Sequence, residues 1–222
     1  MRALSIDTSS PRAGVALWSD GEVIAYQQND EPKLHGERLL TMIERVCADA
    51  GWARSQIDLI ACGVGPGSFA GVRIGVATAK GIALALDRPI QGVASLAAMA
   101  DAAERDADEL VLALLDARKG EVFWAVYDGA GGAATAPAHA SAEALAIALE
   151  PYTRARMVAV GEVASRMTLP GVRVFRSTES DLPHARHIAR CAVARHARGE
   201  HDDVHGLEPV YVRPPDITLP RA

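Results

Sequence analysis

Two aspartates stand at the ends of apolar runs, where a carboxylate can take part in phosphate or metal chemistry. Asp7 ends the run that begins at Arg2, and Asp116 lies in a second run that begins at Glu109. A metal-dependent nuclease needs several convergent acidic side chains to hold two metal ions. Asp116 is the only other strand-end carboxylate that the pattern provides, so the sequence argues against a nuclease.

The segment 63–86 carries six glycines, one proline and one lysine, which suggests a phosphate-binding loop. A P-loop requires G-x-x-x-x-G-K-[ST] between a strand and a helix, but Lys80 follows Ala79 and lies deep within the expected helix. A dinucleotide fingerprint requires G-x-G-x-x-G, and Ser68 stands where its third glycine would be. Pro66 also removes a backbone N–H that such a loop directs at phosphate. The spacing therefore argues against an independent phosphate loop.

A mechanical role explains the same small residues. Residues 65–67 (Gly-Pro-Gly) can turn the chain out of a strand, and Ser68 can cap the following helix. Two small stripes follow within the helix: Gly71, Gly75 and Ala79 on one side, and Ala77 with Gly81 on another. An interior glycine costs about 1 kcal/mol relative to alanine, so we expect close packing against another helix in return. The spacing leaves open whether that helix belongs to this chain or to a partner.

The histidines and cysteines give little support to a metal site or a nucleophile. A helical zinc pair needs a second histidine four residues after His35, and Leu39 occupies that position. We therefore expect His35 to be a polar or interface residue. Two later pairs have spacings that could bind a metal: His184 with His187, and His201 with His205. The segment 201–205 is expected to be a charged surface loop. The three cysteines are far apart and typical of buried, reduced thiols.

Hydrophobic periodicity and turn residues predict an α/β chain. The expected strands of the first half are 2–8, 14–19, 22–28, 57–63 and 89–93, and the expected helices are 34–50, the glycine-rich segment, and a helix capped by Ser95 that runs to about 105. The second half is expected to hold strands at 109–117, 121–128, 157–161 and 172–175, and helices from Ser141 to 151 and over 183–198. Residues 129–138 are expected to be flexible, and the tail that begins at Glu208 to be extended.

The two halves share a local pattern. Asp7 is followed by Gly14 and Trp18, and Asp116 by Gly120 and Trp124, with the same glycine-to-tryptophan spacing. Together with the repeated element order, this predicts two related α/β domains, 1–105 and 106–222, hinged near 104–109. The helix at 183–199 could pack back on the first domain.

Composition places the chain among ordinary globular proteins, with 49% hydrophobic and 23% charged residues. The net charge is −5, and it divides into −8 for residues 1–150 and +3 for residues 151–222. An acidic chain is not expected to grip nucleic acid alone. The basic residues of 151–222 could contact RNA, although a solvated arginine-rich surface is favoured. We recognise neither a leader peptide nor an apolar run of membrane-spanning length, so a cytoplasmic location without membrane contact is expected.

Four segments resemble the bacterial TsaB (YeaZ) family of tRNA threonylcarbamoyladenosine biosynthesis. They are LSIDTSSPRAGVALW at 4–18, GPGSFAGVRIG at 65–75, LLDARKGEVFWAVYD at 114–128 and EPVYVR at 208–213. The resemblance therefore spans nearly the whole chain. One departure is Ala70, where the family usually has threonine.

This resemblance implies a two-domain actin/Hsp70-like (ASKHA) fold built from two RNase H-like halves. It implies a non-catalytic scaffold that binds and activates the transferase subunit TsaD, is joined by the ATPase TsaE, reaches tRNA only through the complex, and forms a homodimer when alone. The complex adds threonylcarbamoyl to the tRNA adenosine beside the anticodon. The transferase's histidine metal pair would fall on His35 and Leu39, so no cofactor is expected in this chain, and ATP and a metal ion are expected in the partner subunits.

The resemblance also suggests candidate site residues. The first expected helix would offer a partner Leu34, His35, Leu39, Leu40 and Ile43. The second would offer Gly71, Arg73, Ile74, Gly75, Ala77, Thr78 and Gly81. A residual nucleotide site would involve Asp7, Ser9 and Ser10.

Two other functions are compatible with such a fold. One is a stand-alone ASKHA-type ATPase or small-molecule kinase, which needs a second glycine-rich phosphate turn. The segment around Asp116 instead offers Ala117, Arg118 and Lys119. The other is a metallopeptidase. Leu39 argues against it, because a helical metal pair with His35 would need a histidine at that position.

Overall fold

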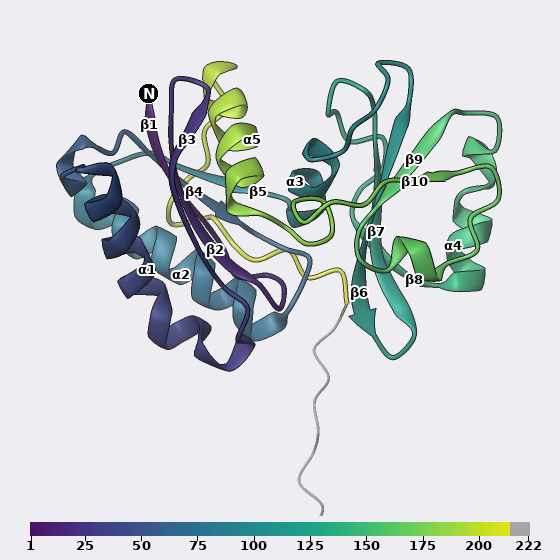
Figure 1. The fold of residues 1–222 in the computed structure, drawn as a ribbon, viewed down its shortest axis with the longest axis horizontal. Helices are drawn as coiled ribbons and strands as arrows, with labels where there is room; N and C mark the ends of the chain where they lie inside the picture. The colour runs from purple at the N-terminus through teal and green to yellow at the C-terminus, as the bar shows by residue number, and fades with distance from the viewer. Residues whose placement is uncertain (214–222) are drawn as a thin grey trace, which may run out of the picture.

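The computed structural model describes residues 1–213, which form two five-stranded sheets flanked by helices (Figure 1). The first sheet has the order β3-β2-β1-β4-β5 and the second β10-β9-β6-β7-β8. The strands of the first sheet are β1 (Arg2–Asp7), β2 (Ala13–Ser19), β3 (Glu22–Asn29), β4 (Leu59–Gly63) and β5 (Ile90–Val93). Those of the second are β6 (Leu110–Arg118), β7 (Glu121–Tyr127), β8 (Ala138–Ser141), β9 (Met157–Val160) and β10 (Arg173–Val174).

The two sheets share one topology, which the repeated sequence pattern anticipates. In each, the first two strands form an antiparallel hairpin, and the first strand also pairs in parallel with a later strand, β4 or β9. Asp20 and Gly21 make the first hairpin turn with positive φ angles of 53° and 92°. Arg118, Lys119 and Gly120 make the second turn, also with positive φ angles. The ends of β1 and β6, with Asp7 and Asp116, therefore occupy equivalent places in the two sheets.

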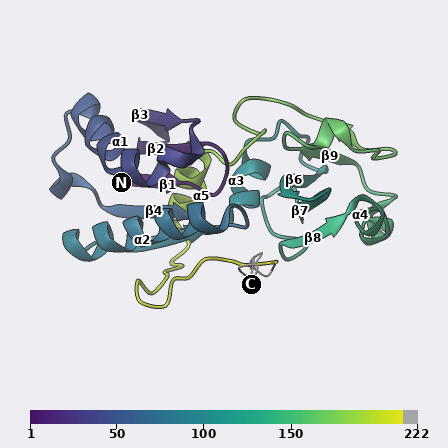
Figure 2. The same ribbon diagram turned by 90° about the horizontal axis from the view of Figure 1, so that it is seen from below.

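Helices cover both faces of the first sheet (Figure 2). The helices of the chain are α1 (His35–Ala50), α2 (Phe69–Leu86), α3 (Ser95–Asp101), α4 (Ala142–Ala148) and α5 (Ala185–Ala197). One face of the first sheet packs against α1 and α2 around Leu4, Ile60 and Val76. The other face packs against α5 around Leu59 and Ile188, so α5 lies on the first sheet although it follows the second sheet in the sequence.

The second sheet has a helix on each face. Leu96 and Met99 of α3 pack with Val111 of β6 on one face, and Leu145 of α4 packs with Leu112 on the other. Short 3-10 turns occur at Pro32–Leu34, Arg54–Gln56, Glu150–Tyr152 and Ala164–Arg166. Because α3 also contacts α5, it lies between the two halves and links them.

Two local expectations about the helix after β5 are wrong. The helix after β5 is α3, which ends at Asp101 rather than near 105, and its N-cap is Ala94. Ser95 does not cap because its hydroxyl is directed to Asp7 instead, at 3.4 Å. Of the segment 129–138, expected to be flexible, only the last residue, Ala138, belongs to β8, which pairs with the edge of β7. Of the extended tail, residues beyond 213 lie outside the described residues.

The apolar character of α2 is unusual. Contrary to expectation, among residues 1–213 it is the one helix long and apolar enough to cross a membrane by length and composition alone, and a third of it is buried. A core helix meets the same criteria, and α2 does pack its buried side on the first sheet. On its other side Ala77, Gly81 and Leu84 are nevertheless exposed, beside the polar Arg73 and Lys80.

Candidate partner-binding surface and interdomain cleft

The turn before α2 fixes where this helix begins. Gly65 has a φ of +95°, a backbone conformation that is strained for any residue with a side chain. At this residue the chain turns from β4 towards the helix. Ser68 Oγ accepts a hydrogen bond from Gly71 N at 3.4 Å, and Ser68 N donates to Ser9 O at 2.6 Å. The expected Gly-Pro-Gly turn and Ser68 cap are therefore confirmed. They hold the first turn of α2 against the loop that follows β1.

The glycines at 71 and 75 face the chain's own core. A Cβ on Gly71 would overlap the carbonyl oxygen of Thr8, and a Cβ on Gly75 would overlap Thr8 Oγ1. Thr8 Oγ1 also donates a hydrogen bond to Gly71 O at 2.7 Å. Ala79, on the same side, is fully buried. The hypothesis that this stripe approaches a helix across a dimer is therefore corrected: it lets α2 approach the loop after β1 within this chain.

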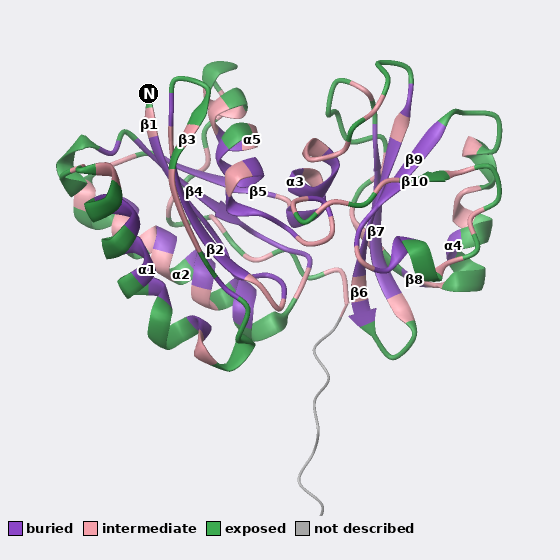
Figure 3. Cartoon of the chain, viewed as in Figure 1, coloured by how far each residue is buried: buried purple, intermediate pink, exposed green. Residues whose placement is uncertain are grey.

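The second small pair points outward. Ala77 and Gly81 are exposed, and a Cβ on Gly81 would have no atom within 4 Å. Leu84, one turn further, is 54% exposed, and Leu40 of α1 is 61% exposed. A Cβ on Gly36 of α1 would lie 3.7 Å from Ile74 Cδ1, so the two helices are close there. We call this surface the outer face, and it consists of Gly36, Leu40, Ala70, Arg73, Ile74, Ala77, Gly81 and Leu84. Figure 3 shows that buried and exposed stretches alternate along both helices.

The other proposed interface residues divide between the two sides. Leu39 and Ile43 are 1% and 6% exposed and belong to the core beneath α1, so they are corrected to core residues. His35 is also buried: its Nε2 lies 3.2 Å from Ser10 O and its Nδ1 lies 3.4 Å from Asn29 Nδ2. Leu34 and Thr78 are half-buried at the margin. Of the proposed interface residues on α1, Leu40 is the one that is exposed.

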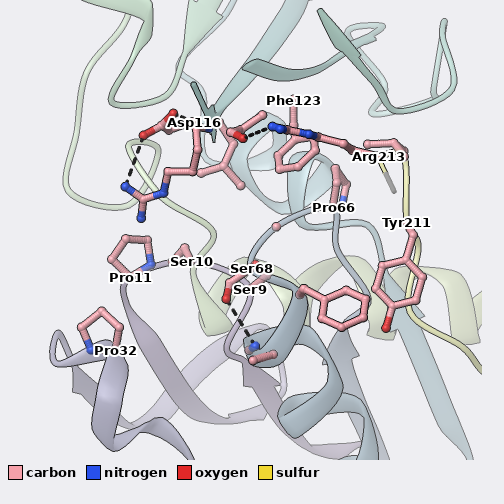
Figure 4. Close-up of a pocket in the computed structure, with 18 of the residues that line it drawn as sticks. Ser9, Ser10, Pro11, Pro32, Pro66, Ser68, Asp116, Phe123, Tyr211 and Arg213 are labelled. Carbon is pink, nitrogen blue, oxygen red and sulfur yellow. Dashed lines mark hydrogen bonds and ion pairs between the residues drawn. The ribbon is translucent and has the colours of Figure 1, made fainter. Parts of the chain in front are cut away.

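A cleft of about 570 Å³ lies between the halves, beside the first turn of α2 (Figure 4). Its first-half lining includes Ser9, Ser10 and Ser68, and its second-half lining includes Asp116 and Phe123. Tyr211, Val212 and Arg213 of the C-terminal segment complete its wall. The cleft thus collects residues from the equivalent ends of β1 and β6.

Asp7 does not reach this cleft. It is 1% exposed, and it accepts hydrogen bonds from Ser9 N at 3.0 Å, Ser9 Oγ at 2.9 Å and Ser95 Oγ at 3.4 Å. A Cβ on Gly63 would overlap the carboxyl group, so the backbone of β4 also closes over it. Burial raises the pKa of Asp7 to about 6, although the bonds from Ser9 and Ser95 lower it. Of the suggested nucleotide-site residues, Ser9 and Ser10 line the cleft and Asp7 lies behind them.

The turn between β6 and β7 contains residues with long side chains. A phosphate-binding turn at this place would instead have glycines, so that its backbone N–H groups could approach the phosphate. Arg118 N donates to Asp116 Oδ1 at 2.8 Å, and the Arg118 guanidinium lies 3.6 Å from Asp116 Oδ2. Arg118 and Lys119 adopt φ angles of 67° and 54°. The aspartate is therefore occupied by its own turn.

The histidines serve structural contacts. His187 bridges Asp101 at 2.7 Å and Glu179 at 3.0 Å, and His184 stacks on Tyr26 with ring centroids 4.4 Å apart. Burial is the main cause that lowers the pKa of His184 to about 4. Within residues 1–213, no group of three or more His, Cys, Asp and Glu side chains is arranged to hold a metal ion.

Two related halves, each a five-stranded sheet flanked by helices, with a cleft between equivalent strand ends, define an actin- and Hsp70-like (ASKHA) protein. A hexokinase of the ROK class from Thermus thermophilus shares this fold with a TM-score of 0.56 over 90% of this chain and all of that one, at 14% sequence identity. Likeness at that identity concerns the fold alone. The fold class expected from the sequence is confirmed.

The particular family follows from closer relatives. The family model of TsaD, tRNA N6-adenosine threonylcarbamoyltransferase, matches residues 28–172. YeaZ from Pseudomonas aeruginosa superposes with a TM-score of 0.81 at 35% identity, over 95% of this chain and 99% of that chain. The Escherichia coli tRNA threonylcarbamoyladenosine biosynthesis protein TsaB is 44% identical over 128 residues, 57% of this chain and 55% of that protein. The chain belongs to the TsaB (YeaZ) family, and it spans about half the length of the curated TsaB relatives that it matches.

Proposed function

We propose that this chain is a non-catalytic subunit of the tRNA threonylcarbamoyladenosine machinery that binds and activates a TsaD-type transferase through the outer face of α1 and α2. The outer face is the observation that carries the proposal. Apart from Arg73 it consists of small and apolar residues, and the opposite side of α2 packs on the first sheet. The names of the relatives supply the pathway and the class of partner.

The shape of the outer face suits a helical partner. Its small members, Ala77 and Gly81, lie between the larger Ile74 and Leu84. A facing helix can therefore approach closely at the small residues and pack against the larger side chains on either side of them. Contiguous exposed apolar surface of this kind is typical of protein–protein contacts. A standard interface buries about 1,600 Å² in total, so α1 must contribute Leu40 and its neighbours as well. The same surface could join two copies of this chain when the transferase is absent.

The rest of the chain supports a scaffold role. Arg118 and Asp116 occupy the turn that a phosphate-binding fold would leave open. In the proposal, ATP and the metal ion therefore belong to the partner subunits, TsaE joins the pair, and all of this takes place in the cytoplasm. Arginines of the basic last third are ion-paired within the chain, among them Arg190 with Asp101 and Arg195 with Asp202. Their engagement favours contact with tRNA only through the complex.

The test is light scattering after size exclusion, with the chain alone and mixed with the transferase subunit. Ala77→Arg places a charge at the centre of the outer face, and Ala146→Arg makes the same change at an exposed position of α4. We expect Ala77→Arg to abolish the 1:1 complex at micromolar concentrations, and Ala146→Arg to leave it intact. Both variants should keep the unfolding temperature of the parent chain. Normal complex formation by Ala77→Arg would place the interface elsewhere.

The cleft favours one alternative, a stand-alone ATPase or small-molecule kinase. It lies where the two halves meet and has a helix N-terminus and three serines in its wall. ATP turnover by the purified chain without partners distinguishes the two functions. Turnover that persists in Ala77→Arg and is lost when Ser10 is replaced would support the enzyme and not the scaffold.

A further inference from the structure

The C-terminal segment 207–213, which we call the strap, runs along the first half before it crosses to the second (Figure 2). Its start is anchored to the first half by Lys80 Nζ, which donates to Leu207 O at 3.0 Å. Val210 N donates to Val64 O at 2.7 Å, and a Cβ on Gly65 would lie 3.0 Å from Val210 O. The first part of the strap is thus fixed beside the turn that leads into α2.

The end of the strap is anchored to the second half. The carbonyl oxygen of Val212 lies 2.8 Å from His139 Nδ1, and the Val212 side chain packs against the core of the second sheet. Arg213 Nη1 donates to Ala117 O at 2.8 Å, and its guanidinium pairs with Glu121 at 3.3 Å. The contacts of Arg213 lie at the β6–β7 hairpin, where Ala117 and Arg213 line the cleft.

Where the strap crosses from the first half to the second, Phe69, Arg73 and Tyr211 form a cluster that we call the clasp. Arg73 Nε donates to Tyr211 OH at 2.7 Å, and the Arg73 guanidinium carbon lies 3.8 Å from the centre of the Phe69 ring. The rings of Phe69 and Tyr211 are 5.0 Å apart. Tyr211 is 45% exposed and Phe69 is 37% exposed. Because solvent reaches both rings, the clasp is a weak contact that can open without exposing the core.

Two further stretches of backbone connect the halves. Residues 102–109 lead from α3 to β6, and residues 175–184 lead from β10 to α5. Asp101 at the end of α3 accepts hydrogen bonds from Arg190 Nε at 2.6 Å and from His187 Nδ1 at 2.7 Å, so α3 is fixed to α5. This side of the molecule has the properties of a hinge, whereas the strap closes the cleft by noncovalent contacts.

We propose that the strap is a releasable clamp that holds the two halves closed over the cleft. When the clasp and the Arg213 contacts break, the halves rotate about α3 and the cleft opens, while each sheet keeps its own core. The clamp is a property of the isolated chain and does not depend on the proposed partner. A partner that contacts Arg73 would also touch the clasp and could so control the cleft.

The reactivity of a thiol inside the cleft tests the clamp. Ala117, 5% exposed, is replaced by cysteine in a background in which Cys47 and Cys191 are replaced by alanine, and the rate of alkylation by N-ethylmaleimide is followed by peptide mapping. We expect Tyr211→Ala and Arg213→Ala each to raise this rate about five- to tenfold, because each substitution removes one or two of the hydrogen bonds that keep the cleft closed. Glu208→Ala, an exposed position of the strap before the crossing, is the matched control and should leave the rate unchanged.

Small-angle X-ray scattering separates opening from local fraying or unfolding. We expect a larger radius of gyration in Tyr211→Ala and Arg213→Ala, with the buried Cys62 still unreactive. If Arg213→Ala makes Cys62 reactive, Tyr211→Phe, which deletes only the hydroxyl group, replaces it under the same criteria. Rates within twofold of the parent chain, an equal rise in Glu208→Ala, or an unchanged radius of gyration would each overturn the clamp.

Discussion

Replacing a glycine by alanine at two positions of α2 tests which side of this helix faces the core. Gly71 lies on the buried side, where a Cβ would overlap the carbonyl oxygen of Thr8. Gly81 lies on the outer face, where a Cβ would have no atom within 4 Å. The two substitutions are chemically identical and lie in one helix. Their effects on the free energy of unfolding should nevertheless have opposite signs.

The expected magnitudes follow from the two environments. Alanine is favoured over glycine in a helix interior by about 1 kcal/mol, so Gly81→Ala should stabilise the first half by about that amount. The same gain exists at Gly71, but overpacking costs about 1–3 kcal/mol. Moving α2 away from Thr8 also weakens the bond from Thr8 Oγ1 to Gly71 O, which contributes about 1 kcal/mol. Gly71→Ala should therefore destabilise the first half by about 1–3 kcal/mol.

Urea denaturation followed by tryptophan fluorescence measures both values. Trp18 and Trp52 report on the first half and Trp124 on the second, so single-tryptophan versions assign each transition to one half. The midpoint of the first-half transition should rise in Gly81→Ala and fall in Gly71→Ala. If both variants were stabilised equally, the close approach of α2 to Thr8 would not exist in solution. The assignment of the inner and outer sides of α2 would then be wrong.

Two further predictions concern buried polar groups near the loop after β1. The pKa of Asp7 is raised from 3.8 to about 6, chiefly by burial, so folding favours its protonated form and the free energy of unfolding should fall as pH rises from about 4 to about 6, by up to about 3 kcal/mol. Asp7→Asn should flatten that decrease, as urea denaturation across this pH range will measure; an unchanged slope would assign it to other groups. His35→Ala should lower the free energy of unfolding by about 1–3 kcal/mol, because it leaves Ser10 O and Asn29 without their buried partner. If His35→Ala lost transferase binding without losing stability, His35 would instead be assigned to the partner interface.

Much of the fold could be predicted because its signals are local. Each hairpin has a turn whose residues tolerate positive φ, and the alternation of apolar runs with helical periods distinguishes the strands from the helices. The Ser68 cap was predictable for the same reason, since a serine after a Gly-Pro-Gly turn has few other roles. Ser95 shows the limit of such reasoning. Its hydroxyl group is oriented by Asp7, 88 residues away in the sequence, and no local pattern records that contact.

The site was harder to predict because small residues lie on both sides of α2. Its inner stripe, Gly71, Gly75 and Ala79, and its outer pair, Ala77 and Gly81, have the same residue types, so spacing cannot tell which one is covered. The position of Thr8 decides the matter, and that position depends on how β1 and β4 pair. The strap was predictable as an extended segment, but its contacts with Val64 and Ala117 join strands from both halves and had no sequence signal.

One helix thus makes two close approaches, and this explains why it contains so many small residues. The inner glycines let α2 rest on the loop after β1, and that contact fixes the direction in which Ala77 and Gly81 point. A substitution on the inner stripe should therefore reduce stability first and association only as a consequence. A substitution by a large side chain on the outer pair should reduce association without reducing stability, because nothing within residues 1–213 covers it. Gly75→Arg cannot separate these effects, since its side chain would have to displace Thr8, whereas Ala77→Arg can.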